Sequence, residues 1–138
     1  MADIVKRPQS RCVLIIRAGD VPESLQPPRP LSLKRFITAE EHSTQVSMTW
    51  VHIWGHHERV VNAESDRVYY ILEGEGAFQV GDGAPIETVN AGDVVYIAHG
   101  VPYEFEGHMR YIVMNGPAFT AGSDKVLPPQ FSSQTQGG

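Results

Sequence analysis

Two tryptophans and two histidines alternate with smaller residues along one stretch of the chain, at Trp50, His52, Trp54 and His56. Successive side chains of a β-strand point to opposite faces, so these four would share one side of a strand. If that side faces the interior of a barrel, it offers aromatic walls and imidazoles to a small ligand. In the alternative, the tryptophans belong to the core and His52 is a hydrogen-bonded packing residue. We keep His52 and Trp54 as candidates for substrate binding.

His56 ends this stretch beside Gly55, where the mouth of a barrel is expected. A neutral histidine, with an ordinary pKa of about 6.5, can remove a proton at physiological pH. A nearby tyrosine such as Tyr69 can donate a hydrogen bond or a proton to developing charge. The pair could catalyse elimination or enolisation next to a carbonyl without a metal ion. We therefore predict His56 and Tyr69 as catalytic residues.

Arg67 lies two residues before Tyr69, so strand alternation places both side chains on one face. Pointing inward, its guanidinium could hold a carboxylate or phosphate by paired hydrogen bonds, or stabilise an enolate. The alternative is an ion pair with Asp66, Glu64 or another acidic residue at the rim. We keep both interpretations, with Arg67 as a substrate-binding candidate.

The remaining polar residues carry weaker signals. Asn62 could bind a ligand's hydroxyl group, but an asparagine at a strand end or turn is as often structural. His57 is expected on the face opposite His56 and, like His99 in a turn, as a solvent-exposed residue. His52, His56 and His99 could also converge on an unusual metal site.

Composition limits the kind of protein that presents these residues. The 138 residues suit one domain with one core, and 41% hydrophobic residues with 13 Gly and 10 Pro fit a folded, turn-rich chain. The net charge of -5 comes from scattered residues, which argues against a nucleic-acid polymer as partner. Cys12 is the only cysteine, and no apolar run approaches the roughly 20 residues that span a bilayer. We expect a cytoplasmic protein without a membrane partner.

Short runs rich in β-branched and aromatic residues, separated by glycine-bearing turns, predict an all-β domain. Turns are expected at 74–76 and at Gly107, among others, and a helical turn is possible only at 39–42. Before these runs lie an expected strand at 12–16 and a proline-rich loop at 21–30; after them, the tail from 125 onward is expected to be mobile or draped on the barrel. The expected strands are 46–54, 67–73, 77–80, 86–89, 94–98, 103–106 and 109–115.

Two segments resemble the two signature motifs of the cupin superfamily. They are RVYYILEGEG at 67–76, a strand that runs into a Gly-x-Gly turn, and AGDVVYIAHGVPY at 91–103, with its Gly-Asp start and apolar strand. The resemblance covers about half of the chain, roughly 50–119. It implies a single cupin double-stranded β-helix, or jelly-roll barrel, at 31–120, with an N-terminal strand and arm at 1–30 and a flexible tail at 121–138.

The metal-binding positions of this family hold other residues here. In metal-binding cupins the first motif supplies two histidines and a glutamate, and the second motif supplies a further histidine. Arg67 occupies the glutamate position and Tyr103 the last histidine position, while the remaining two positions hold Val, Ala or Asn, depending on spacing. A guanidinium cannot ligate a cation and repels one. We expect no inherited metal site and no cofactor, with Tyr103 lining the pocket.

A narrower resemblance exists to the small metal-free cupin dehydratases that act on a nucleoside 5′-aldehyde in uridyl-peptide (pacidamycin-type) antibiotic biosynthesis. It implies His56 as base and Tyr69 as a site residue. Phe105 stands where those enzymes have another tyrosine, Ala121 where they have an acidic residue, and Lys34 matches a site lysine only with a gap. The matching residues are Gly55-His56, Asn62, Tyr69-Tyr70, Met109 and Pro117-Ala118-Phe119.

These observations predict a metal-independent lyase of the dehydratase type that acts on a sugar, nucleoside or polyketide-like small molecule. The same residues would serve an isomerase, epimerase or cyclase, because each begins with the same proton abstraction. Two functions of a different kind stay open: a non-catalytic cupin that binds a small ligand, and a metalloenzyme with displaced histidines. Partner subunits are expected, a homodimer among them. The substrate-binding candidates are Arg67, Tyr103, Asn62, His52, Trp54, Phe105 and Lys34.

Overall fold

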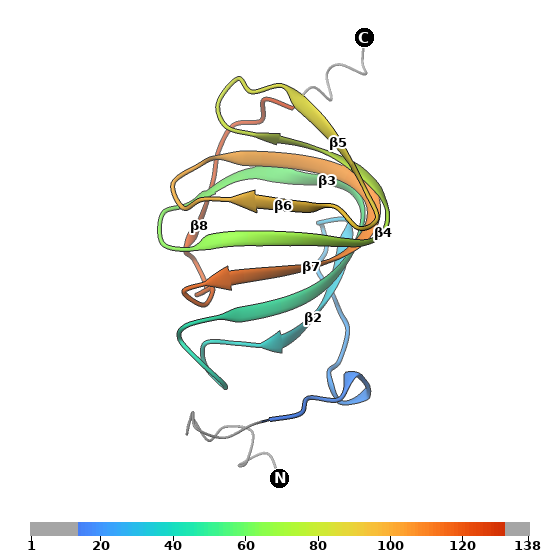
Figure 1. Ribbon diagram of the computed structural model, residues 1–138, viewed down its shortest axis with the longest axis vertical. Helices are drawn as coiled ribbons and strands as arrows, with labels where there is room; N and C mark the ends of the chain where they lie inside the picture. Colours follow the sequence, from blue (N-terminus) through green and yellow to red (C-terminus); the bar gives the residue numbers. More distant parts are fainter. Residues whose placement is uncertain (1–13, 132–138) are drawn as a thin grey trace.

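The computed structural model describes residues 14–131, which form an antiparallel β-structure with one short 3-10 helix at Ala18–Asp20 (Figure 1). No helix within these residues is long and apolar enough to cross a membrane. The strands are β1 (Ser24–Leu25), β2 (Leu31–Ile37), β3 (Ser47–Asn62), β4 (Asp66–Val80), β5 (Ile86–Asn90), β6 (Val94–Ile97), β7 (Tyr103–Gly116) and β8 (Asp124–Val126).

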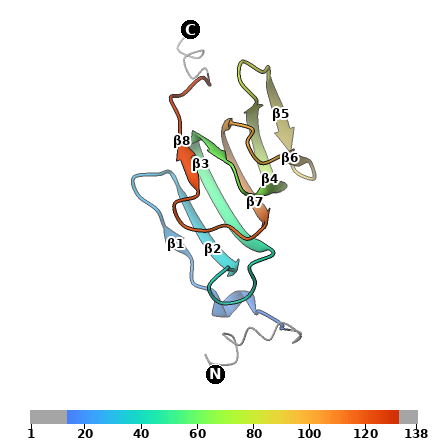
Figure 2. The same ribbon diagram turned by 90° about the vertical axis from the view of Figure 1, so that its left-hand side faces the viewer.

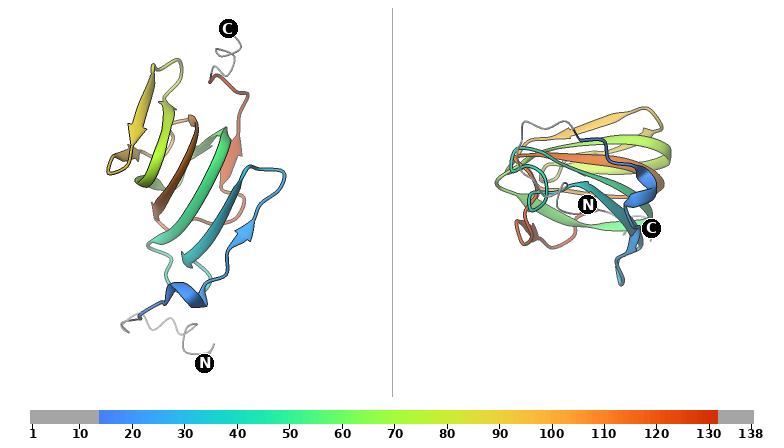
Figure 3. Two further views of the ribbon diagram at one scale, coloured as in Figure 1. Left: turned by 90° about the vertical axis from the view of Figure 1, so that its right-hand side faces the viewer. Right: turned by 90° about the horizontal axis from the view of Figure 1, so that it is seen from below.

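The strands are ordered β1-β2-β3-β7-β4-β5, which can be followed across the left panel of Figure 3. In addition, β6 pairs with the first part of β4, and β8 pairs with the last part of β3, beside which it lies in Figure 2. The long strands β3, β4 and β7 curve back on themselves at the right of Figure 1. Each therefore contributes to two facing walls of one barrel, as the predicted jelly roll requires.

Three glycines lie in register where the long strands bend. Gly55 of β3 pairs with Gly107 of β7, which pairs with Gly76 of β4. A Cβ atom on either Gly76 or Gly107 would lie 2.7 Å from a carbonyl oxygen of the neighbouring strand. The strands can approach this closely only without side chains. The prediction of turns at 74–76 and at Gly107 is therefore wrong, because these glycines lie at bends inside continuous strands.

The ends of the chain differ in part from the prediction. Of the strand expected at 12–16, Cys12 and Val13 lie outside the described residues, and 14–16 form no strand. Strand β2 was not predicted, and the expected turn at 39–42 is present. The segment after residue 120 contributes β8 and then packs on the barrel as far as Phe131, which is 4% exposed. Residues 132–138 lie outside the described part.

Candidate active site

The interior face of β3 is the odd-numbered one. Val51 and Ile53 are 4% and 0% exposed, whereas Trp54 is 38% exposed on the opposite face. On β3 the compact β-branched side chains point into the barrel, and the larger tryptophan ring of Trp54 lies outside. The ligand-facing side predicted from the tryptophans is therefore the outer side.

Three of the predicted site residues lie on the outer face. The Lys34 ammonium lies over the Trp50 ring at 5.8 Å from its centroid, and the rings of His52 and Trp54 meet edge to face at 5.1 Å. Cation–π and aromatic contacts of this kind stabilise a sheet surface. Lys34, His52 and Trp54 are thus placed outside the barrel, and the structure does not bring them to a ligand pocket.

His56 also lies on the outer side, where it holds the C-terminal segment. Its Nε2 is 2.6 Å from Oε2 of Glu104, whose side chain is fully buried. The other carboxylate oxygen of Glu104 accepts hydrogen bonds at 2.8 Å from the backbone N–H groups of Gln130 and Phe131. The placement of His56 as the base at the barrel mouth is therefore corrected, because its imidazole is engaged away from the lumen.

His57, the next residue, is the histidine of the lumen. Its ring stacks on Phe105 at 4.5 Å, and its Nδ1 lies 2.8 Å from the carbonyl oxygen of Glu58. A carbonyl can only accept, so Nδ1 carries the hydrogen and Nε2 of the neutral ring is a free acceptor. Burial lowers the pKa of His57 below its usual value, and the positive charge of Arg29 acts in the same direction. The expectation of a solvent-exposed His57 is wrong.

A hydrogen-bond chain of three side chains lies near His57 in the lumen, and the ring of one of them, Tyr103, stacks on the His57 ring at 6.4 Å. Nη1 of Arg67 donates to the Tyr103 hydroxyl at 2.5 Å, and the hydroxyls of Tyr103 and Tyr69 are 2.6 Å apart. Burial raises the pKa of both tyrosines, so both stay protonated near neutral pH. Because neighbouring hydrogen bonds polarise one another, the Arg67 guanidinium makes the Tyr69 hydroxyl, at the other end of the chain, a stronger hydrogen-bond donor.

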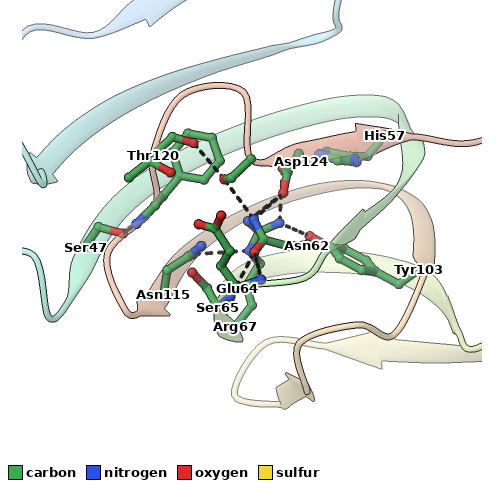
Figure 4. Close-up of polar contacts among 12 residues, drawn as sticks. Ser47, His57, Asn62, Glu64, Ser65, Arg67, Tyr103, Asn115, Thr120 and Asp124 are labelled. Atoms are coloured by element: carbon green, nitrogen blue, oxygen red, sulfur yellow. Dashed lines mark hydrogen bonds and ion pairs between the residues drawn. The ribbon is translucent and has the colours of Figure 1, made fainter.

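Arg67 is held in place by an acidic residue that the sequence did not single out (Figure 4). Its Nη2 is 3.0 Å from Oδ1 of Asp124 on β8, and its Nε donates to Oδ1 of Asn115 at 3.2 Å. The predicted ion pair is thus formed, with Asp124 as the partner. Asn62 donates to the same carboxylate at 2.9 Å and accepts from the N–H groups of residues 64 and 65, so its role is structural.

A cavity of about 140 Å³ opens between β2 and the segment that leads into β8. Both His57 and Tyr69 line it, whereas Tyr103 stands behind Tyr69 and is 1% exposed. Phe105, with no exposed surface, packs against the rings of both His57 and Tyr69. Tyr69 and Arg67 thus lie at this cavity, with Tyr103 and Phe105 as supports.

Cross-strand register divides the interior into an apolar and a polar end. Inward-facing residues that pair across β2, β3, β7 and β4 form rows. From the apolar to the polar end the rows are Leu31-Ile53-Met109, Leu33-Val51-Tyr111-Ile71, Arg35-Thr49-Val113-Tyr69 and Ser47-Asn115-Arg67.

The metal ion of metal-binding cupins does not fit these residues. The Arg67 guanidinium and the Tyr103 hydroxyl occupy two ligand positions, and a cation beside Arg67 would be repelled. His52, His56 and His99 lie apart, and His99 bonds Asp66 at 2.8 Å. Between residues 14 and 131, no three His, Cys, Asp or Glu side chains lie close enough to hold a metal ion.

Comparison with known proteins connects the chain to the cupin fold. A Streptomyces Pac13 variant with uridine superimposes with a TM-score of 0.73 at 15% identity over 89% of this chain and 97% of that one. Pac13 is described as a unique nucleoside dehydratase. The polyketide cyclase RemF from Streptomyces resistomycificus gives a TM-score of 0.70 at 16% identity, covering 91% of this chain and 94% of its own.

KdgF from Halomonas sp. gives a TM-score of 0.66 at 11% identity, covering 78% of this chain and 96% of its own. No protein-family model and no curated protein matches the sequence. These similarities confirm the predicted cupin fold and the likeness to the dehydratase in architecture.

Proposed function

We propose that this cupin-fold chain is a small-molecule enzyme that catalyses elimination next to a carbonyl, with His57 as general base and Tyr69 as hydrogen-bond donor. The observation that carries the proposal is that His57, whose Nδ1 is held by the Glu58 carbonyl so that Nε2 is left as the basic nitrogen, lines the same cavity as Tyr69. A partly buried, neutral histidine in a cavity is suited to remove a proton at neutral pH. Substrates of the sugar, nucleoside or polyketide-like class have the required carbonyl and hydroxyl groups.

The proposed reaction takes place in two steps. Nε2 of His57 removes a proton from the carbon next to the carbonyl, while Tyr69 donates a hydrogen bond to the carbonyl oxygen as negative charge develops there. The electron pair then forms a carbon–carbon double bond as the β-hydroxyl group leaves. The His57 imidazolium returns its proton to that hydroxyl, which departs as water.

Isomerisation or cyclisation is a second candidate for the same residues, since the first step is shared. The structural likeness to a polyketide cyclase favours keeping it. The two reactions differ in whether a leaving hydroxyl is positioned near His57. Product analysis distinguishes them, because isomerisation keeps the mass of the substrate and cyclisation forms a new ring, whereas elimination removes one water without closing a ring.

The proposal is tested in D₂O with a panel of nucleoside 5′-aldehydes, uronates and β-hydroxy ketones. Deuterium in recovered substrate or isomerised product reports proton abstraction followed by reprotonation, and an unsaturated product reports abstraction followed by elimination. We expect His57→Gln to lower the rate at least about 100-fold and Tyr69→Phe to lower it as well. His56→Gln is the matched control and should keep the rate of its folded fraction. Loss in His56→Gln with retained exchange in His57→Gln would contradict the assignment.

A further inference from the structure

Positively charged residues outnumber negatively charged ones in the lining of the cavity. Arg29, Arg35 and Arg67 face one carboxylate, that of Asp124. Asp124 pairs with Arg67, which leaves the other two cations without a carboxylate partner. Within residues 14–131, the guanidinium of Arg29 bonds only the neutral side chain of Gln26, at 3.4 Å, and Arg35 forms no ion pair. A cleft lined by one sign of charge concentrates counter-ions.

A buried donor at the polar end of the cavity has no partner. The Asn115 side chain is 5% exposed, and its Oδ1 accepts from Nε of Arg67, which fixes the orientation of the amide. Its Nδ2 therefore faces away from Arg67 and makes no hydrogen bond in the described structure. A buried N–H group without an acceptor destabilises the folded state, so a ligand oxygen that accepts from this group would be favoured.

Arg35, which has no carboxylate partner, and Asn115, whose Nδ2 has no acceptor, belong to neighbouring rows of inward-facing residues. Asn115 pairs with Ser47 on β3, and Arg35 pairs with Thr49, two residues farther along the same strand. Residues two apart on a strand share a face, and all four side chains line the cavity. Donor groups thus gather at the polar end. His57, whose Nε2 is an acceptor, lies beyond the bend of β3 at Gly55 and therefore in the facing wall.

From this arrangement we infer that the ligand is anionic and that its carboxylate or phosphate group binds between Asn115 and Arg35. The inference rests on the proposal that the lumen cavity is the ligand site, and it names the ligand class. Nδ2 of Asn115 supplies the buried hydrogen bond to the anionic oxygen, and Arg35 supplies the charge at the mouth. A cavity of about 140 Å³ holds a part of the ligand about as large as a benzene ring.

Anion binding at this end leaves the carbonyl part of the ligand within the cavity that His57 and Tyr69 line. Burial lowers the pKa of His57, and the charge of Arg29 acts in the same direction because a nearby cation disfavours the imidazolium. An anionic ligand seated between Asn115 and Arg35 would thus approach the base in its active protonation state. Two classes of compound combine a carbonyl with such an anionic group: small oxo acids and phosphorylated carbonyl compounds.

The test uses the full-length ¹⁵N-labelled chain and NMR titration with pyruvate, inorganic phosphate and the neutral isostere pyruvamide. At least one anion should shift the Asn115 side-chain amide signals, and pyruvamide should not. Response to pyruvate alone identifies a carboxylate ligand, and response to phosphate alone or to both identifies a site open to phosphate. No shift with either anion, or equal binding of pyruvamide, overturns the inference.

Substitutions add a matched comparison. Arg35→Gln removes an exposed charge and should weaken anion binding about tenfold. Arg110→Gln removes the same charge on the outer face, where Arg110 bonds Glu73 at 3.0 Å, and should leave anion binding unchanged. Equal weakening by both variants contradicts the inference. Binding without turnover contradicts only the proposed function, and turnover of neutral substrates without anion binding contradicts only this inference.

Discussion

Removing the Tyr103 hydroxyl should destabilise the protein far more than removing an exposed tyrosine hydroxyl. Tyr103→Phe keeps the ring and deletes the atom that joins Arg67 to Tyr69. That oxygen accepts from the guanidinium at 2.5 Å and lies 2.6 Å from the second hydroxyl. Both contacts are fully buried, so water cannot replace them.

The expected loss follows from these two contacts. A hydrogen bond to a charged group contributes about 1.5–3 kcal/mol and a neutral one about 0.5–1.5 kcal/mol. Nη1 of Arg67 retains a weaker contact with Asp124 at 3.3 Å, which offsets part of the loss. We expect a decrease of about 3 kcal/mol in the free energy of unfolding. With a urea m-value of about 2 kcal/mol/M, the midpoint falls by about 1.5 M.

Urea denaturation followed by tryptophan fluorescence measures this change. Tyr96→Phe is the matched control, because Tyr96 is 58% exposed and bonds Asp66 at 3.1 Å on the surface. Its unfolding free energy should change by less than about 0.5 kcal/mol. A loss below about 1 kcal/mol in Tyr103→Phe would refute the claim that the buried chain is a strong interaction.

Three further results are expected. Burial lowers the pKa of His57, so below pH about 6.5 the unfolded chain binds more protons than the folded chain. The free energy of unfolding should therefore decrease as the pH falls through this range. In urea titrations at several pH values, His57→Gln should make the unfolding free energy depend less on pH. Glu104→Ala should raise amide hydrogen exchange at Gln130 and Phe131, whereas unchanged protection would show that the carboxylate does not hold them. Gly107→Ala should cost about 1–3 kcal/mol, since its Cβ would lie 2.7 Å from a carbonyl oxygen; a stable variant would contradict the close approach at the bend.

The cupin fold could be predicted because its signals are local. Runs of β-branched residues, glycines and the Gly-Asp start of the second motif stand in the sequence at the spacing of one barrel. The glycines at 76 and 107 carry the same local signal for a turn or a bend. Only the register of β4 with β7, which is a long-range property, shows that they are bends.

The site was harder to predict because alternation defines two faces of a strand without showing which is inside. Tyr69 and Arg67 were placed correctly on one face, and that face is the lumen. On β3 the large aromatic rings suggested the wrong face, although Val51 and Ile53 are the more typical core residues. Asp124 gave no local signal, since its role depends on β8 pairing with the end of β3.

The central claim is that His57, with a free Nε2, is the neutral base of the lumen. Long-range ¹H–¹⁵N NMR of the histidine rings tests it directly across a pH titration, without any substrate. Because Nδ1 bonds the Glu58 carbonyl and the ring is largely removed from water, we predict the Nδ1–H tautomer and a pKa below the usual value for His57. An Nε2–H tautomer, or a pKa at or above about 6.5, would contradict the account.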